Sequence, residues 1–478
     1  MALKVRNTAT RSLETFVPLE EGRARVYACG PTIYSHAHIG NFRAFVFFDL
    51  VHRYLEWSGY DVRFVMNLTD VDDKVIDAAY EAGTSIQEHT RPFGEVFLAD
   101  CETLGIRRVD AYPRATEYIE EMVDFVKTLV ERGHAYAAED GAVYYAIGTF
   151  PDYGKLKGID PSTLKSGARV AQDEYQKEDV RDFALWKAAT EKDEAVGAAW
   201  DSPWGRGRPG WHLECSVMSV TELGDTLDLH LGGEDLVFPH HENEIAQSEG
   251  ATGKPFVRNW LHVKHLFVEG RKMSKSLGNF IRVRELLDDG HDPAAIRHLL
   301  LSSHYRGDLN FTEQGLEASQ SAVQRLLNLE ARLDDLAVDE GAEGSRLPTL
   351  SETMTESFRR AMDDDLNSAD ALAAVFVFVG QVNAELDELG GPVRPGDRDA
   401  ASGALRSVDE VLGLLEVARA ARAVDDELAA WVEEKIEERA QARAERDFAR
   451  ADAIRDQLAE RKIVLEDGPE GTKWKVAG

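Results

Sequence analysis

Cysteine is scarce in this sequence, whose 478 residues include only Cys29, Cys101 and Cys215. A small, odd number of cysteines excludes a disulfide-stapled scaffold and is typical of reduced thiols, some of which can bind metal. Long apolar runs are also missing, because the best of them, residues 371–379, has about half the length that spans a bilayer. Residues 1–15 contain no apolar segment of the secretory type. We therefore expect a cytoplasmic protein with no membrane segment.

Positive charge is outnumbered as well. The 55 lysines and arginines stand against 86 aspartates and glutamates, so the formal net charge is −31. Such a surface as a whole repels a polyanion, and nucleic acid can bind only along a local basic groove. Hydrophobic residues at 43% and charged residues at 29% fit a folded chain rather than a disordered one. The length predicts roughly two to four domains.

The N-terminal part alternates strand and helix patterns. Residues 23–29 (RARVYAC) predict a strand, residues 41–57 have the apolar period of a helix, and residues 61–68 predict a second strand. This order predicts a βαβ unit in an open parallel sheet. Ligands bind such sheets beyond the carboxyl ends of the strands, where residues 30–41 follow the first strand.

The middle of the chain changes character. Residues 115–199 contain one predicted helix at 117–132 and a predicted hairpin at 136–147, and we interpret them as an insertion in the sheet domain. Residues 211–231 and 257–268 are predicted to be strand-rich and to return to the sheet.

From residue 312 onward the pattern is helical almost throughout. Residues 354–389 and 398–415 predict the helices of a bundle, and residues 425–460 predict a charged helical tail. Residues 463–476 predict a short final hairpin.

The first motif with chemical content is the string HAHIGN at residues 36–41, which opens the first helix. The imidazole of His38 can donate to phosphate oxygens, and the helix N-terminus adds free N–H groups and a partial positive charge. Gly40 has no Cβ, so a base or ribose can lie against its backbone. Taken alone, the same string fits an ordinary helix cap in a polar loop.

The second motif is KMSKS at residues 272–276, followed by LGN. Lys272 and Lys275 stand among small polar residues and can follow phosphate charge as it moves. Taken alone, such a string also fits a solvated loop. Together, a histidine–glycine helix start after the first strand and a downstream KMSKS resemble the two-part signature of class I aminoacyl-tRNA synthetases.

A third group of residues has the chemistry of a metal site. His240 and Glu244 are four residues apart, which places both side chains on one face of a helix. Cys215 precedes them, and Cys29 ends the first strand. Two thiolates, one imidazole and one carboxylate are suitable ligands for Zn²⁺. Each residue alone also fits a bland role, a surface contact for the His–Glu pair and a small buried hydrophobe for each cysteine.

Longer motifs make the resemblance more specific. The strings GPT with HIGN, NLTDVDDK (67–74), GRPGWHLEC (207–215) and FPHHENE (238–244) resemble those of cysteinyl-tRNA synthetases. The resemblance runs over essentially the whole chain. It implies an α/β class I synthetase fold, with a Rossmann-like parallel sheet, an insertion domain, a C-terminal helical bundle and a small anticodon-binding domain. The domains implied are residues 1–114, 115–199, 200–311, 312–420 and 421–478.

The same resemblance implies an activity and its participants. The activity is ATP-dependent ligation of L-cysteine to tRNA(Cys) through cysteinyl-adenylate, releasing AMP and pyrophosphate. The cofactors are one Zn²⁺ per chain, which recognises the cysteine thiol, and ATP with Mg²⁺ as substrate. The protein is expected to be a monomer.

The resemblance also assigns residues to roles. The implied zinc ligands are Cys29, Cys215, His240 and Glu244. The implied catalytic residues are His38, Lys272 and Lys275. The implied ATP contacts are Thr32, His38, Gly40, Asn41, Gly232, Gly233, Asp235 and Lys275. The implied cysteine contacts are Thr69, Trp211 and His230. Trp474 is the implied anticodon contact.

One position departs from the commonest family pattern, because Asn41 stands where HIGH motifs have histidine. An amide can still donate to phosphate, but it cannot become cationic.

Two other hypotheses remain open at this point. A ligase that joins cysteine to a glucosaminyl-inositol acceptor resembles the catalytic half but lacks an anticodon-binding end, and the tail after residue 425 therefore favours tRNA. The second hypothesis is a non-catalytic relative that binds tRNA or zinc. The intact His38, Lys272 and Lys275 make this hypothesis the weaker one.

Overall fold

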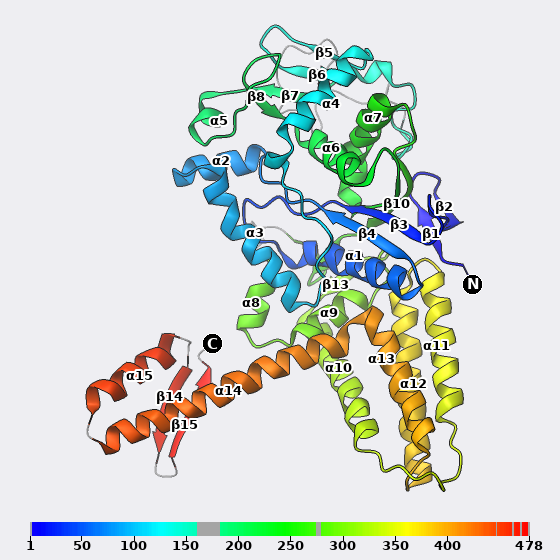
Figure 1. Ribbon diagram of the computed structural model, residues 1–478, viewed down its shortest axis with the longest axis vertical. Coiled ribbons are helices and arrows are strands. Elements are labelled where there is room, and N and C mark those ends of the chain that lie inside the picture. The colour runs from blue at the N-terminus through cyan, green and yellow to red at the C-terminus, as the bar shows by residue number, and fades with distance from the viewer. Residues whose placement is uncertain are drawn as a thin grey trace.

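The computed structural model describes residues 2–159, 182–273, 279–445, 447–460, 463–468 and 471–476. A parallel sheet of four strands lies at its centre, in the order β10–β9–β3–β4 (Figure 1). These strands are β3 (Arg23–Ala28), β4 (Asp61–Met66), β9 (Leu227–Gly233) and β10 (Val257–Val263). The helix α1 (Ile39–Trp57) joins β3 to β4. The βαβ unit and the parallel sheet predicted from the sequence are therefore confirmed.

The helix α1 is apolar around most of its circumference, and this matches its position. It contacts the sheet on one side and the helices α9 (Pro293–Leu301) and α13 (Pro395–Leu412) on the other. Phe42, Phe45 and Phe48 are buried among these elements. A helix that is hydrophobic all round is stable only when it is enclosed in this way.

Further helices flank the sheet, namely α2 (Asp73–Ala82), α3 (Ile86–Thr103), α6 (Trp211–Leu223) and α7 (Glu242–Thr252). The prediction that residues 211–231 are strand-rich is wrong for the first half, because Trp211–Leu223 forms α6. Val217 and Val220 favour strands locally, but α6 packs against α7 and β3, and this packing outweighs intrinsic propensity.

A second, antiparallel sheet forms the inserted part above the central sheet in Figure 1. Its strands are β5 (Ala135–Ala137), β6 (Val143–Tyr145), β7 (Phe183–Ala188) and β8 (Gly207–Pro209). Two helices accompany it, α4 (Ile119–Glu131) and α5 (Glu191–Ala195), with single helical turns at Ala115–Glu117 and Ile147–Thr149. The predicted helix and hairpin in this region are confirmed, and β8 extends the sheet beyond residue 199.

Smaller elements complete the part of the chain before residue 312, which we call the catalytic half after the resemblance above. The strands β1 (Lys4–Asn7) and β2 (Ser12–Thr15) form an N-terminal hairpin. The strand β11 (Leu266–Val268) pairs antiparallel with β12 (Arg271–Lys272) and parallel with β13 (Leu309–Phe311). Residues 257–268 thus return to the central sheet only as far as β10, and β11 belongs to this separate sheet. The helix α8 (Val283–Asp288) follows.

The helical part begins with α10 (Glu313–Asp334), α11 (Leu347–Asp363), α12 (Ser368–Leu389) and α13. The single helix predicted across 354–389 is broken between α11 and α12, where Asp365 and Leu366 adopt positive φ. Within the described residues, α12 is the one helix long and apolar enough to cross a membrane by length and composition. It packs against α11 and α10, as a core helix of a bundle does.

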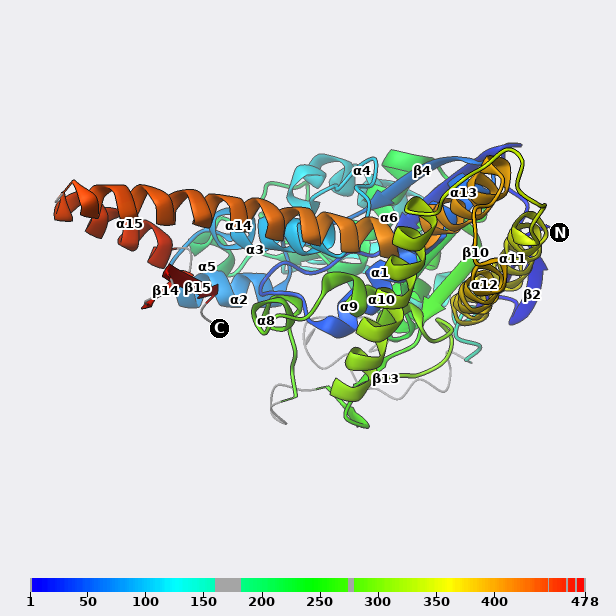
Figure 2. The same ribbon diagram turned by 90° about the horizontal axis from the view of Figure 1, so that it is seen from below.

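The chain ends in a long arm. The helix α14 (Leu414–Ala444) leads away from the bundle to α15 (Phe448–Glu460) and to the hairpin of β14 (Ile463–Gly468) and β15 (Gly471–Val476). Figure 2 shows α14 extending beyond the catalytic half, with these elements at its far end. The predicted helical tail and final hairpin are confirmed, although the tail is two helices and starts earlier than predicted.

Candidate active site and metal centre

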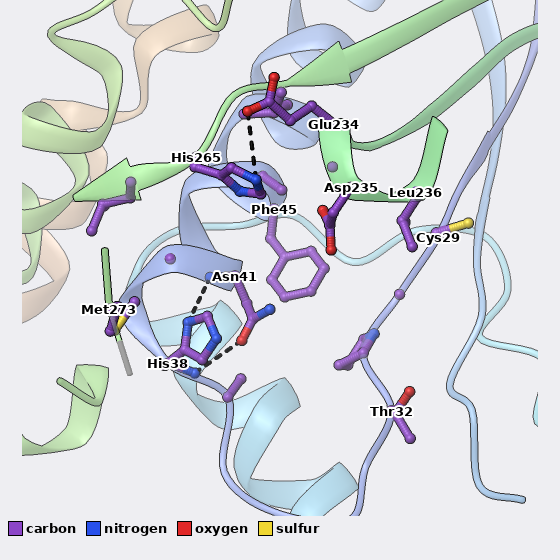
Figure 3. Close-up of a pocket in the computed structure, with 18 of the residues that line it drawn as sticks. Cys29, Thr32, His38, Asn41, Phe45, Glu234, Asp235, Leu236, His265 and Met273 are labelled. Carbon is purple, nitrogen blue, oxygen red and sulfur yellow. Dashed lines mark hydrogen bonds and ion pairs between the residues drawn. The ribbon is translucent and has the colours of Figure 1, made fainter. Parts of the chain in front are cut away.

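A cavity of about 770 Å³ opens at the carboxyl ends of β3 and β9, as expected for a parallel sheet. Figure 3 shows side chains that line it, from the loop after β3, from α1 and from the turn after β9. The predicted site residues in its wall are Cys29, Thr32, His38, Gly40, Asn41, Trp211, Gly233, Asp235 and Lys272. The structure therefore brings together residues that are distant in the sequence.

Other predicted residues lie elsewhere. Thr69, His230 and Gly232 are absent from the wall that the described residues form, and Thr69 and His230 are buried. Lys275 lies outside the described residues. Of Trp474 only the backbone is described, in β15 opposite Leu465. The roles of these five residues, like those of the predicted residues in the wall, stay predictions.

His38 is fixed in one orientation by the helix that it starts. Its ring Nδ1 accepts a hydrogen bond from the backbone N–H of Asn41 at 3.2 Å. The backbone N–H of His38 in turn donates to Asn41 Oδ1 at 3.1 Å (Figure 3). Because Nδ1 accepts, a neutral His38 ring carries its proton on Nε2. The capping box thus fixes the ring at the helix N-terminus, with Nε2 as the nitrogen that does not cap the helix.

Described residues on both sides of positions 274–278 lie near this helix start. The N–H of Ile39 donates to Ile281 O at 2.9 Å, and Asn279 Nδ2 donates to Lys272 O at 3.2 Å. A Cβ at Gly40 would lie 2.9 Å from Met273 Cε and 3.1 Å from the His38 ring. Gly40 therefore lets Met273 lie against the helix, and Lys272 lines the same cavity as His38.

The cavity is also lined by charged residues that were not predicted as site residues. Lys74, Lys157 and Lys264 add positive charge to its wall, and His265 faces Glu234 with 3.5 Å between Nε2 and Oε1 (Figure 3). In a chain of net charge −31, this gathering of cations favours an anionic ligand. Lys74 ends the string NLTDVDDK, whereas no motif signalled Lys157 or Lys264.

Five possible metal ligands meet at Cys29, which is the one among them that lines the cavity. Cys29 Sγ lies 3.9 Å from Cys215 Sγ and 3.3 Å from His241 Nε2, and His240 Nε2 lies 3.0 Å from Glu244 Oε1. Two thiolates bound to one tetrahedral zinc at ~2.3 Å lie ~3.8 Å apart. The ligand atoms of Cys29, His240, His241 and Glu244 all lie within 4.8 Å of one another. The donor set and spacing therefore fit a zinc ion.

The charges in this cluster are coupled. Burial lowers the pKa of His240, but Glu244 and Cys215 together outweigh burial and raise this pKa to about 10. Burial raises the pKa of Glu244, yet His230 and His240 bring it down to about 2. A hydrogen bond from Cys29 lowers the pKa of the Cys215 thiol. Anionic donors are thus present, and metal binding would release the proton of His240.

His241 is the ligand candidate that sequence analysis missed. Its Nδ1 lies 2.7 Å from His262 Nε2, and His262 Nδ1 lies 2.7 Å from Thr8 Oγ1, so the chain of contacts orients the ring. A Cβ at Gly232 would lie 2.5 Å from the His241 ring, so Gly232 makes room for it. The doubled histidine in FPHHENE was the available signal.

The predicted ligands are themselves held by buried neighbours. His240 Nδ1 lies 2.9 Å from His212 Nδ1, and Glu244 Oε2 accepts from His230 Nε2 at 2.9 Å. The His230 ring stacks on Trp260, with 4.5 Å between ring centroids. Partners of this kind orient ligands and tune a metal site.

Comparison with known proteins matches two regions of the chain to described families. Residues 15–321 match the family described as tRNA synthetases class I (C) catalytic domain, and residues 357–416 match the DALR domain. The chain is 46% identical over 475 residues to the cysteine–tRNA ligase of Solibacter usitatus, covering 99% of this chain and 100% of that protein. It is also 46% identical over 489 residues to the cysteine–tRNA ligase of Symbiobacterium thermophilum, covering 100% of both.

A solved structure shows the same fold at lower identity. Mycobacterium tuberculosis methionyl-tRNA synthetase in complex with methionyl-adenylate aligns with a TM-score of 0.59 and 17% identity. The alignment covers 82% of this chain and 90% of that one. The class I synthetase fold predicted from the sequence is therefore confirmed, and full-length identity above 40% narrows the class. The chain belongs to the cysteine–tRNA ligase family, enzymes that join cysteine to tRNA.

Proposed function

We propose that the chain ligates L-cysteine to tRNA(Cys) in two steps, through cysteinyl-adenylate. The proposal rests on one observation, that a single cavity joins the thiol and imidazole cluster at Cys29 to the helix start at His38. An amino acid and a nucleotide would lie side by side there, with the cysteine carboxylate in line with the α-phosphorus of ATP. Pyrophosphate leaves in the first step. Positioning then supplies most of the rate, because no protein nucleophile is needed.

The phosphates of ATP and its Mg²⁺ would lie at the start of α1. His38 Nε2–H, the helix N-terminus and Lys272 would stabilise the charge that moves onto the leaving pyrophosphate. Lys275 is proposed to act with Lys272. Asn41 contributes mainly by holding His38, since its Oδ1 accepts from the His38 backbone. Thr32, Gly40, Gly232, Gly233 and Asp235 are proposed as further contacts of the nucleotide.

Zinc is proposed to recognise the substrate thiol, held by Cys29, Cys215, His240 and Glu244. When bound, it would supply a soft Lewis acid that prefers the thiolate of cysteine to the hydroxyl of serine. An apolar pocket alone separates such small side chains by only ~10–200-fold. The fit of the donor atoms supports this role, as does the lowered pKa of Cys215.

The substrate side chain would be enclosed by Trp211. The centroid of the Trp211 ring lies 4.4 Å from that of the His240 ring, and Trp211 stays 37% exposed at the cavity. Thr69 and His230 are proposed to complete the cysteine pocket from behind, as buried polar neighbours.

In the second step the cysteinyl group would pass to the 2′-hydroxyl of the terminal adenosine of tRNA, and AMP would leave. The arm of α14, α15 and the final hairpin is proposed to contact the anticodon, with Trp474 stacking on an unpaired base. We also propose the domain limits at residues 114 and 311, a monomeric state and a cytoplasmic location.

The test is charging of unfractionated tRNA with labelled cysteine, in the presence of excess serine. Persistent charging with cysteine supports the acceptor and the thiol-selective site together. Cysteine-dependent exchange of ATP with pyrophosphate tests the adenylate separately. Exchange without tRNA charging would refute the proposed acceptor and favour a small amine such as a glucosaminyl-inositol. Loss of exchange after zinc removal, restored by zinc, tests the metal.

A further inference from the structure

Three charged side chains that do not line the cavity are buried where the long arm leaves the catalytic half. They are Asp49 and Arg53 on α1 and Arg297 on α9, exposed by only 4%, 1% and 0%. Asp49 Oδ2 accepts from Arg53 Nε at 2.8 Å and from Arg297 Nη2. We call these three residues the anchor cluster.

The anchor cluster binds the ends of two other helices. Arg53 Nη2 donates to Gly105 O at 2.6 Å and Arg297 Nη1 donates to Leu104 O at 3.1 Å, at the end of α3. Arg297 Nε donates to Leu412 O, the last residue of α13, at 2.6 Å. The carbonyls of helix C-termini lack partners within their helix, so cations there satisfy both hydrogen bonding and the helix dipole.

The cluster also holds the first turn of α14. Arg53 Nη1 pairs with Glu416 Oε2 at 2.7 Å. The Asp409 carboxylate accepts the backbone N–H groups of Leu414, Leu415 and Glu416 at 2.8–2.9 Å. Gly413 joins α13 to α14 with φ of +65°, and a Cβ there would lie 3.2 Å from both Arg297 and Arg53.

Arg419 pairs with Glu330 at 3.5 Å, and the base of α14 also packs against α9 and α10. Its buried residues near the catalytic half end at Ala418, and Arg419 and Ala420 are exposed. Figures 1 and 2 show the helix running on from this point to α15 and the final hairpin. Its 31 residues rise ~46 Å, so a tilt of ~10° at the base moves its far end by ~8 Å. That displacement exceeds the reach of any hydrogen bond.

We propose that the anchor cluster positions α14, and through it sets the distance between the active site and the C-terminal domain. The helix α1 is capped by His38 in the active site and contains Asp49 and Arg53. One rigid helix therefore connects the base of the arm to His38. Buried ion clusters contribute little net stability compared with apolar packing, so specifying one geometry is the better account of this one.

The inference rests on the proposed function, in which tRNA binds the arm and the active site at once. Two linked contacts strengthen each other only when the geometry allows both to form. A misdirected arm should therefore weaken charging of full-length tRNA and leave untouched a substrate that engages the active site alone. The anchor residues are positioning residues, because they contact neither the cavity nor its ligands.

The test variant is Gly413→Ala, whose methyl group would press on both guanidinium groups. The matched control is Gly390→Ala, at the end of α12, with φ of +56° and nothing within 4 Å of the added Cβ. Both variants suffer the same backbone strain, but only Gly413→Ala disturbs the cluster. Three rates are measured for each full-length protein: cysteine-dependent pyrophosphate exchange, charging of a tRNA(Cys) transcript, and charging of its acceptor-arm minihelix.

For Gly413→Ala we expect kcat/KM with the transcript to fall at least ~tenfold, as misplacement by ångströms does. Exchange and minihelix charging should stay within ~twofold, and Gly390→Ala should change none of the three. An equal fall of all three rates, or an unchanged rate with the transcript, would overturn the proposal. If the wild-type protein charges no tRNA, the proposed function fails instead, and the two failures are distinguished.

A milder variant covers the case in which Gly413→Ala does not fold. Glu416 has a half-exposed side chain, 53% accessible, and pairs with the buried Arg53. Glu416→Gln removes the charge of that pair with little risk to folding. It should lower kcat/KM with the transcript ~3-fold or more while minihelix charging is retained. Equal effects on both RNAs would again refute a positioning role.

Discussion

Replacing His230 with phenylalanine tests how the metal centre is supported. His230 is fully buried, and its ring stacks on Trp260 with an interplanar angle of 20°. His230→Phe retains a flat ring of similar size, so this packing is largely kept. The substitution removes the N–H group that Glu244 Oε2 accepts at 2.9 Å.

The size of the effect follows from that one contact. A hydrogen bond to a charged group contributes ~1.5–3 kcal/mol, and its loss leaves the Glu244 carboxylate oxygen without this donor. Burial raises the pKa of Glu244, and His230 heads the groups that lower it to about 2. Without His230 the carboxylate is a weaker ligand. The zinc dissociation constant should therefore rise ~10–100-fold, as for other outer partners of metal ligands.

The assay is competition for zinc with a chromophoric chelator at pH ~7, where Glu244 is ionised in the wild type. The control is His298→Phe on α9, a partly buried histidine that pairs with Ser319 at 3.0 Å. It should leave zinc affinity unchanged. The reasoning is refuted if His230→Phe binds zinc within ~3-fold of the wild type. A raised KM for cysteine at unchanged zinc affinity would instead support direct contact between His230 and the substrate.

Three further predictions concern other parts of the chain. Asp49→Asn should lower the free energy of unfolding by roughly 3–5 kcal/mol at pH ~7, because it removes the buried carboxylate charge that Arg53 and Arg297 share. Burial raises the pKa of Asp49, but Arg297 and Arg53 hold this pKa below the ordinary value of 3.8. Its stabilisation is therefore present above that value and lost as pH falls through the folded-state pKa, so urea titrations should show the two proteins converging in acid. Gly40→Ala should slow pyrophosphate exchange at least ~tenfold, because the methyl group displaces Met273, whereas Gly380→Ala, which has open space around it, should not. Cys215→Ala should abolish bound zinc by metal analysis, and the equally buried Cys101→Ala should retain it.

Each of these has a clear contrary result. A constant difference between wild type and Asp49→Asn down to pH ~2 would show that the carboxylate charge is not the source of the stability. Normal exchange by Gly40→Ala would mean that the KMSKS segment need not approach α1. Full zinc content in Cys215→Ala would assign the fourth position to His241, whose Nε2 lies 3.3 Å from Cys29 Sγ.

Much of the fold was predictable because its signals are local. The alternation of residues 23–68 specifies strand, helix and strand through apolar period alone. The final hairpin and the helical C-terminal half follow from the same patterning. The helix α6 was not predictable in this way, since Val217 and Val220 favour strands and only packing against α7 and β3 makes the segment helical.

The candidate site was likewise predictable only in its local features. The motifs around His38, Cys215 and His240 specify which chemical groups are present, because a motif is read from neighbouring residues. Only the folded sheet brings Cys29 to within 3.9 Å of Cys215, across 186 positions of chain. It also places His241 in the cluster, a residue the sequence offered no reason to prefer.

The sequence by itself therefore determined the family, the sheet and the chemistry of the site, since residue identity and short-range periodicity are enough for these. The tertiary structure alone decided which buried side chains support the ligands and how the arm is anchored. Arg53 and Arg297 are ordinary helix residues in the sequence. They meet at Asp49 because α1, α9 and α13 pack together, and contacts between distant segments depend on that packing rather than on local pattern.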